Sequence, residues 1–160
     1  MTYSTILKKT PVTNKILIYM YIALDFDGTC VSHDFPKIGA DIGALPVLRK
    51  LVDAGHQLIL FTMRSDKKDV QSDDYNIHGK SGHYLTQAVD WFRKNDIPLA
   101  GININPRQSK WTNSPKAYAQ LYIDDAALGI PLTVEPRLSE RPFVDWQRVE
   151  QLLIERGVIK

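Results

Sequence analysis

The sequence contains a single cysteine, Cys30, among its 160 residues. One cysteine cannot form an intramolecular disulfide, and it cannot supply the several thiolates of a cysteine-based zinc site. A secreted disulfide scaffold is therefore excluded as well. A chain without disulfides is typical of a reducing compartment, so we expect a cytoplasmic protein.

Long hydrophobic runs are also missing. The apolar segment ILIYMYIAL, residues 16–24, follows several lysines and so resembles the start of a signal peptide. It is too short for a bilayer, which requires about 20 apolar residues. It is followed by Asp25 rather than by a small-residue cleavage site. We therefore expect a buried strand and no membrane association.

Neither sign of charge dominates the chain. The 20 Lys and Arg residues nearly balance the 18 Asp and Glu residues, and no basic block is long enough to suggest a nucleic-acid arm. The composition, 44% hydrophobic and 24% charged, fits one soluble domain with a sizeable core. Residues 1–15 are polar and lack a clear period, and a chain that begins at Met20 keeps every later motif. This predicts a leader at 1–19 outside a single domain at 20–160.

Apolar, β-rich segments alternate with segments of helical periodicity along the chain. The expected strands are 16–24, 56–62, 99–105 and 119–125. The expected helices are 46–55, 84–95 and 145–157, the last with Asp145 as its N-cap. This order predicts an α/β fold, a doubly wound (Rossmann-like) parallel sheet with helices on both faces and no large cap domain.

Acidic residues follow two of the predicted strands. Asp25 and Asp27 come directly after the first strand, and Asp124 and Asp125 end the last one. Ligands of such sheets bind at the carboxyl ends of the strands, so these side chains should converge. Two carboxylates about 4 Å apart repel by roughly 4 kcal/mol at an effective dielectric of 20. Oxygen ligands of this kind favour Mg²⁺ as the neutralising cation.

Three segments together resemble the motifs of the haloacid dehalogenase superfamily in its phosphatase form. They are DFDGT at 25–29, FTMRS at 61–65 and SPKAYAQLYIDD at 114–125. The resemblance covers residues 20–130. The segments around them are similar to a small capless group of bacterial and phage proteins within that superfamily.

This resemblance implies a Mg²⁺-dependent phosphoester hydrolase. Asp25 would be the nucleophile that forms an aspartyl-phosphate, and Asp27 would protonate the leaving oxygen and then activate water. Thr62 and Lys116 would bind the phosphoryl oxygens. Asp25, the backbone carbonyl of Asp27, and Asp124 would bind Mg²⁺.

Loops around the expected site bear on its substrate. Residues 30–41 have room only for a flap, and the long polar segment 64–83 favours a solvated mobile loop over a substrate-recognising lid. Arg107, Lys110 and Trp111 place basic groups beside an aromatic ring, which suits a nucleotide. The expected partner is a phosphorylated small molecule, a nucleotide or a polynucleotide end.

Several alternatives accompany these assignments. DFDG could form a calcium-binding turn, but the residues after it lack the further acids of such a loop. Asp124 and Asp125 could cap a turn, and Asp125 could support the metal site without binding the ion. Lys110 competes with Lys116 for the phosphate role, although Lys116 directly precedes the last motif.

The remaining alternatives concern the histidines and the overall activity. His33, His78 and His83 are expected to be solvated loop residues rather than metal ligands. A catalytically silent phosphate-binding or scaffolding protein could keep the same fold. A phosphotransferase would differ from a hydrolase only in whether water or another acceptor reaches the intermediate.

Overall fold

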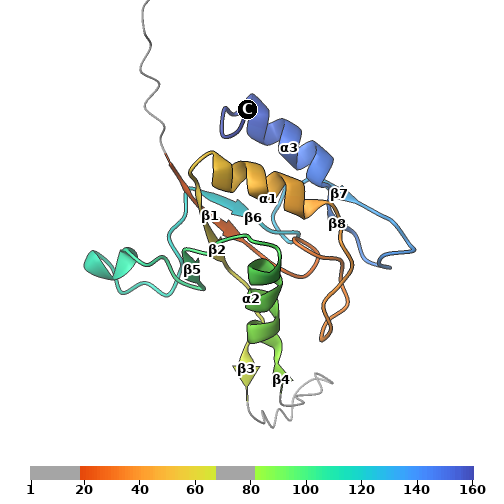
Figure 1. Ribbon diagram of the computed structural model, residues 1–160, viewed down its shortest axis with the longest axis horizontal. Helices are drawn as coiled ribbons and strands as arrows, with labels where there is room; N and C mark the ends of the chain where they lie inside the picture. The colour runs from red at the N-terminus through yellow and green to blue at the C-terminus, as the bar shows by residue number, and fades with distance from the viewer. Residues whose placement is uncertain (1–18, 68–81) are drawn as a thin grey trace, which may run out of the picture.

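A parallel β-sheet forms the centre of the molecule. The computed structural model describes residues 19–67 and 82–160. Within them, four strands pair in the order β5-β2-β1-β6 (Figure 1). These strands are β1 (Tyr21–Leu24), β2 (Gln57–Leu60), β5 (Gly101–Ile102) and β6 (Leu121–Ile123). All three pairings are parallel, which confirms the predicted α/β class and parallel sheet.

The α-helices lie close to their predicted positions. They are α1 (Ala44–Asp53), α2 (Tyr84–Lys94) and α3 (Trp146–Glu155). Asp145 caps α3 as expected, because its carboxylate accepts a hydrogen bond of 3.2 Å from the N–H of Arg148. An ion pair between Lys50 and Glu150 connects α1 to α3 on their exposed sides.

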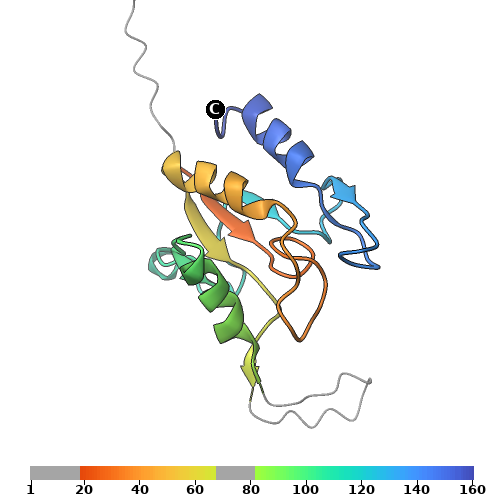
Figure 2. The ribbon, with the colours of Figure 1, turned by 45° about the vertical axis from the view of Figure 1, so that its right-hand side comes forward.

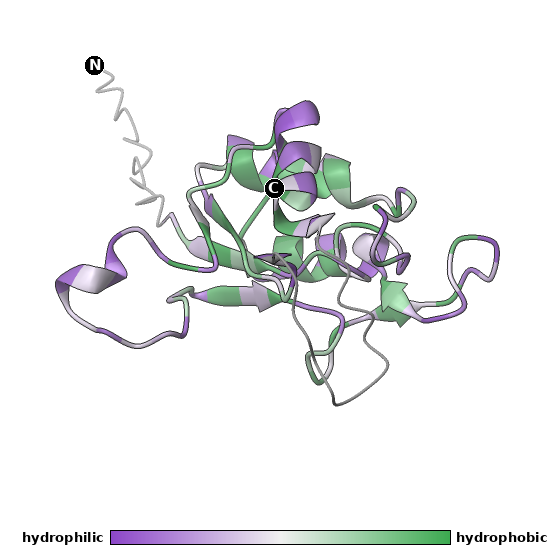
Figure 3. Ribbon diagram, turned by 90° about the horizontal axis from the view of Figure 1, so that it is seen from below, coloured by the Kyte–Doolittle hydropathy of each residue, from purple (hydrophilic) through white to green (hydrophobic). Residues whose placement is uncertain are grey.

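One face of the sheet carries the main hydrophobic core. The register pairs Ile22 with Leu58, and Leu24 with both Leu60 and Ile123, so these alternating side chains point to the same face. The helix residues packed in the same core are Val47, Leu48 and Leu51 of α1, Ala88 and Phe92 of α2, and Val149 and Leu153 of α3. Figure 3 shows hydrophobic residues gathered along the strands and hydrophilic residues on the outer sides of the helices.

The expected helices on both faces of the sheet are not confirmed. All three α-helices of the described chain contribute to the core on one face. The connection from β5 to β6, which would carry a helix across the other face, contains only the short 3-10 helix η1 (Gln108–Lys110). On that other face Lys116, from this connection, lies over the ring of Tyr122 of β6.

Two small antiparallel pairs, which the sequence did not predict, lie outside the main sheet. β3 (Asp66–Lys67) pairs with β4 (Gly82–His83), and β7 (Leu132–Thr133) pairs with β8 (Phe143–Val144). The central part of the segment expected to be a mobile loop, residues 68–81, lies outside the described residues. β8 adjoins the turn after β1, since the N–H of Val144 donates to the carbonyl of Gly28 at 2.9 Å (Figure 2).

Of the helices in residues 19–67 and 82–160, none combines the length and the apolar character needed to cross a bilayer.

Candidate active site

Three carboxylates converge at the carboxyl ends of β1 and β6. Leu24 and Ile123 are register partners, so Asp25 and Asp124 continue from neighbouring strand ends. The N–H of Asp25 donates to the carbonyl of Ile123 at 3.0 Å, which extends the pairing by one residue. One carboxylate oxygen each of Asp25, Asp124 and Asp125 lies within 4.8 Å of the others. We call these three residues the acidic cluster.

Thr29 connects the two strands that supply the acidic cluster. Its hydroxyl donates to Oδ2 of Asp25 at 3.3 Å, and the hydroxyl oxygen of Thr29 accepts the N–H of Asp125 at 3.0 Å. Thr29 is fully buried, and its carbonyl accepts the indole N–H of Trp146 at 2.7 Å. The sequence analysis gave Thr29 no role, although the residue belongs to the DFDGT motif. Its position holds Asp25 and Asp125 in a fixed relation, with α3 behind them.

The acidic cluster concentrates negative charge. Burial raises the pKa of Asp25 to about 7, and the charges of Asp124, Asp125 and Asp27 act in the same direction, while the backbone N–H of Phe26 opposes them. Burial also raises the pKa of Asp125, against the nearby His33. No lysine or arginine of the described chain makes an ion pair with the cluster. His33 is the one basic side chain of the described residues in contact with the cluster, at Asp125. A cluster of carboxylate oxygens without a lysine or arginine partner has the chemistry that a hard cation requires.

Asp27 has a different environment from the acidic cluster. Its two carboxylate oxygens accept hydrogen bonds from Nε and Nη2 of Arg64, both at 2.7 Å. The Arg64 side chain is only 1% exposed, whereas the Asp27 side chain is 20% exposed. The sequence analysis did not identify Arg64, although it lies two residues after Thr62 in the FTMRS motif.

The two predicted phosphate-binding residues lie in separate environments. The N–H of Thr62 donates to Oδ1 of Asn103 at 2.8 Å, and the Thr62 hydroxyl accepts the N–H of Arg64 at 3.2 Å. The ammonium of Lys116 lies 5.4 Å from the ring centroid of Tyr122. It makes no ion pair with an acid of the described chain. The structure therefore places Thr62 beside Arg64 at the end of β2 and does not place Lys116 against the acidic cluster.

The prediction that His33 is a solvated loop residue is wrong. Its Nε2 lies 3.2 Å from Oδ2 of Asp125 and 3.1 Å from the carbonyl of Pro142. The carbonyl of Pro142 can only accept, so a hydrogen bond there uses the tautomer with its hydrogen on Nε2. Gly28 makes this contact possible, because a Cβ at Gly28 would lie 2.2 Å from Nε2 of His33. Of the two other histidines in this prediction, His83 ends β4 and His78 lies outside the described residues.

The loop that carries the predicted nucleotide-binding pair extends from the body of the molecule. It connects β5 to β6 and is visible at the left of Figure 1. Trp111 is 63% exposed, and its ring packs edge-on against Tyr118 with centroids 5.3 Å apart. Arg107 donates to the hydroxyl of Tyr19 at 3.3 Å. An aromatic surface with nearby cations is thus available to solvent.

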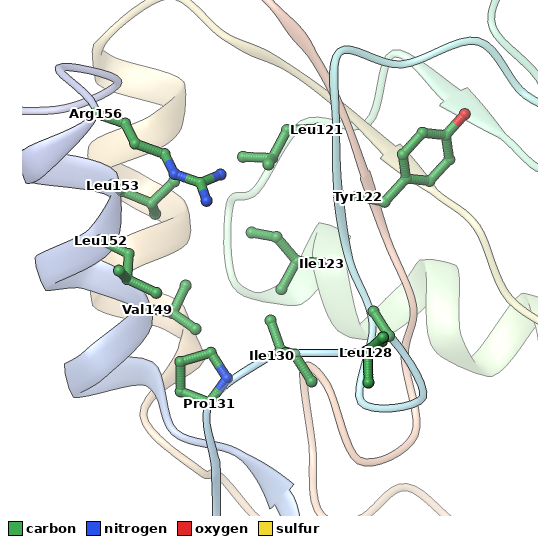
Figure 4. Close-up of a pocket in the computed structure, with 12 residues that line it drawn as sticks. Leu121, Tyr122, Ile123, Leu128, Ile130, Pro131, Val149, Leu152, Leu153 and Arg156 are labelled. Carbon is green, nitrogen blue, oxygen red and sulfur yellow. The ribbon is translucent and has the colours of Figure 1, made fainter.

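A separate pocket of about 190 Å³ lies between β6 and α3. Figure 4 shows apolar side chains on its walls, with Arg156 reaching over one side. The lining includes Leu121, Ile123, Ile130, Val149, Leu153 and Arg156. None of the acidic cluster lines this pocket, so the cluster and the apolar pocket are separate features.

Comparison with known proteins gives one informative similarity. The chain is similar to a solved structure described as the conserved protein coded by locus from Bacteroides thetaiotaomicron, with 30% sequence identity and a TM-score of 0.62. The similarity covers 86% of this chain and 92% of that chain, and the description states no activity. No protein-family model and no curated protein matches.

Proposed function

We propose that this chain, which belongs to the same family as the conserved Bacteroides thetaiotaomicron protein, is a Mg²⁺-dependent phosphoester hydrolase of the haloacid dehalogenase type. The observation that supports this best is the acidic cluster. Asp25, Asp124 and Asp125 bring carboxylate oxygens within 4.8 Å of one another at adjacent parallel strand ends. Ligand sites of parallel α/β sheets are found at this edge.

Asp25 is the nucleophile in this proposal. Its carboxylate attacks phosphorus, the ester oxygen leaves with the bond electrons and takes up a proton that Asp27 would supply, and an aspartyl-phosphate forms. Water, whose proton Asp27 would accept, then attacks this phosphorus, releases phosphate and restores the Asp25 carboxylate. The burial of Asp25 reduces the competing solvation of its charge, and Thr29 fixes the direction of its Oδ2.

The acidic cluster would hold Mg²⁺ together with the backbone carbonyl of Asp27. When bound, the ion would neutralise negative charge on the phosphoryl group and on the carboxylates. Asp125 is added to the expected ligands because one of its carboxylate oxygens lies within 4.8 Å of those of Asp25 and Asp124. The hydroxyl of Thr62 and the ammonium of Lys116 would bind phosphoryl oxygens, which requires the exposed Lys116 side chain to move from Tyr122.

The substrate in this proposal is a phosphorylated small molecule, a nucleotide or a polynucleotide end. The exposed Trp111 supports the last two, because a base can stack on an accessible aromatic ring. The cytoplasm remains the expected location, since the only cysteine is free and buried.

A catalytically silent phosphate-binding protein is the second candidate. The position of Lys116 favours it, because the residue expected to neutralise the phosphoryl group lies on Tyr122 and makes no ion pair with a described acid. A phosphotransferase would use the same covalent step with an acceptor other than water. Both candidates predict measurable differences from a hydrolase.

The test is phosphate release from a broad panel of phosphomonoesters, including p-nitrophenyl phosphate, nucleoside monophosphates and 3'-phosphorylated oligonucleotides. Each substrate is measured with Mg²⁺ and with a chelator. We expect Mg²⁺-dependent turnover that falls by roughly 10⁴-fold or more in Asp25→Asn. Asp53→Asn, at an exposed position of α1, is the matched control and should keep full activity.

Two results would contradict the proposal. Turnover that survives in Asp25→Asn would exclude the covalent mechanism. A wild-type protein that binds inorganic phosphate with Mg²⁺ but hydrolyses no substrate of the panel would favour the silent binder. A third result, release of p-nitrophenol only in the presence of an added alcohol, with formation of the phosphate ester of that alcohol and no free phosphate, would indicate a phosphotransferase.

A further inference from the structure

Arg64 is a buried cation whose hydrogen bonds are all made within the protein. Its Nε and Nη2 bind the two oxygens of Asp27 at 2.7 Å, and Nη2 also donates to the carbonyl of Lys37 at 2.6 Å. Nη1 donates to the carbonyls of Pro36 at 3.3 Å and Tyr84 at 3.5 Å. An arginine has five N–H groups, and these five contacts use all of them.

The faces of the Arg64 guanidinium are occupied as well. Its Cζ lies 5.1 Å from the ring centroid of Phe26 and 5.1 Å from that of Phe35. With its edges and faces filled, and only 1% of the side chain exposed, Arg64 cannot bind a substrate phosphate. Arg64 can therefore affect a bound substrate only by positioning the groups that it contacts.

Three separate parts of the chain meet at Arg64. They are the turn after β1 through Asp27, the loop before α1 through Pro36 and Lys37, and the start of α2 through Tyr84. Asp27 is the one partner with a reactive group, and it lies two residues after the proposed nucleophile. Its side chain remains 20% exposed, so Asp27 is accessible from outside whereas Arg64 is not.

We propose that Arg64 is a positioning residue that acts through Asp27. The two parallel hydrogen bonds fix the plane of the Asp27 carboxylate and direct its remaining lone pairs toward the crevice, where a leaving group or a water molecule would be bound. The hydrogen bonds from Arg64 to the carbonyls of Pro36 and Lys37 would fix the loop before α1 in position relative to the Asp27 carboxylate. This inference rests on the proposed function of the Asp25 site.

The chemistry of the pair requires arginine rather than any cation. A planar guanidinium matches a carboxylate with two parallel N–H donors, whereas a lysine ammonium offers a single point charge on a flexible stem. Arg64→Lys therefore keeps the charge and removes the orientation of Asp27. A displacement of about 1 Å at a reacting group lowers turnover by roughly 10²-fold.

The test is a double-mutant cycle on the best substrate found for the wild type. We expect Arg64→Lys to lower kcat by about 10- to 100-fold, with KM changed by less than about 3-fold. Asp27→Asn should lower kcat by about 10² to 10⁴-fold. If Arg64 acts through Asp27, the double variant should be no slower than Asp27→Asn alone, within about 3-fold.

A spectroscopic measurement tests the pair without removing Arg64. The Nε–H of Arg64 should give a slowly exchanging NMR signal that shifts or broadens in Asp27→Asn. This measurement remains possible even where Arg64→Lys does not fold.

Arg93→Lys is the matched control for the kinetic experiment, because Arg93 also pairs with an aspartate, Asp90, but the Arg93 side chain is 76% exposed. The kcat of Arg93→Lys should equal that of the wild type.

The outcomes separate this inference from the proposed function. An active wild type with a double variant whose loss equals the product of the single losses would overturn the positioning role and leave the hydrolase proposal intact. An Arg64 Nε–H signal that is unchanged in Asp27→Asn would also overturn it. A wild type without turnover on any phosphoester would overturn both.

Discussion

Two carboxylates, Asp25 and Asp27, follow β1 two residues apart, and their surroundings in the protein are opposite. Asp27 is held by a buried arginine through two hydrogen bonds of 2.7 Å. Asp25 shares its surroundings with Asp124 and Asp125 and has no basic partner in the described chain. A protein that can place a guanidinium beside one acid could have neutralised the other as well.

The difference indicates which carboxylates are available to a ligand. The charge of Asp27 is already balanced by Arg64, so Asp27 does not require a bound cation. The acidic cluster has no lysine or arginine partner in the described chain, and only His33 contacts it, at Asp125, so its oxygens can accept a cation and the cluster costs stability without one. Stability measurements on the metal-free protein can therefore distinguish the two groups before any activity is known.

The largest expected change in the free energy of unfolding comes from breaking the balanced pair. Arg64→Met should lower it by about 3–5 kcal/mol, because the variant leaves Asp27 and three carbonyls without their donor. Urea denaturation measures the change. Arg93→Met removes an exposed partner of Asp90 and should change stability by less than about 1 kcal/mol. Equal effects of the two variants would contradict the distinction between buried and exposed pairs.

Gly28 lies between the two groups, and a side chain there should disturb both. Its φ is +79°, and an added Cβ would lie 2.2 Å from Nε2 of His33 and 2.9 Å from Oδ2 of Asp125. Gly28→Ala should lower the free energy of unfolding by about 3 kcal/mol, combining backbone strain with a steric clash.

Gly43→Ala is the matched control for this variant. Gly43 has a similar φ of +84°, but an added Cβ there would meet no atom within 4 Å. Strain alone should cost about 1–2 kcal/mol. Thermal unfolding of both variants separates the strain from the clash, and a Gly28→Ala protein as stable as Gly43→Ala would show that His33 moves freely.

A substitution in the acidic cluster should have the opposite effect and raise the free energy of unfolding of the metal-free protein. Burial raises the folded-state pKa of Asp25 from 3.8 to about 7. The folded protein therefore holds a proton that the unfolded chain releases, and stability falls as the pH rises through this window. Above it, Asp25→Asn should make the metal-free protein more stable than the wild type by about 2 kcal/mol.

The measurement for Asp25→Asn is urea denaturation with a chelator between pH 4 and pH 8. The difference between wild type and variant isolates Asp25 from carboxylates such as Asp66, whose pKa is lowered by its hydrogen bonds with Thr86. Mg²⁺ should reduce the difference by stabilising the wild type. A variant that is less stable than the wild type at pH 8 without metal would show that the Asp25 charge is balanced.

Local pattern predicted the parts of the fold that bury apolar residues. The strands are short apolar, β-rich runs, the three helices repeat hydrophobic residues at the helical period, and Asp145 is a local cap, so each could be placed from neighbouring residues alone. The short pairs β3–β4 and β7–β8 have no such period, because their positions depend on contacts with distant segments. The sequence also did not show that the connection from β5 to β6 lacks an α-helix, because the path of that connection depends on how the whole chain packs.

The site shows the same division. Asp25 and Asp124 were predicted to converge because both directly follow apolar strands, and parallel strands end at one edge. The pairing of Arg64 with Asp27 joins residues 37 positions apart, and His33 reaches a carbonyl 109 positions away. A sequence shows that such residues are present, but the choice of partner depends on the packing of loops around them.

The smallest expected change in stability concerns the other cation that lies over an aromatic ring. Lys116 lies 5.4 Å from the Tyr122 centroid and is exposed, whereas Arg64 is buried between two rings. Because exposed cation–π contacts contribute only about 0.5–1 kcal/mol, Lys116→Met should lower the free energy of unfolding by less than about 1 kcal/mol. Phosphoester hydrolysis should nevertheless fall by roughly 10² to 10³-fold, since a lost stabiliser of the reacting charge has an effect of that order. Lys94→Met, at an exposed position in the last turn of α2, is the control and should keep its activity. Full activity in Lys116→Met would remove Lys116 from the site and leave its contact with Tyr122 as its only role.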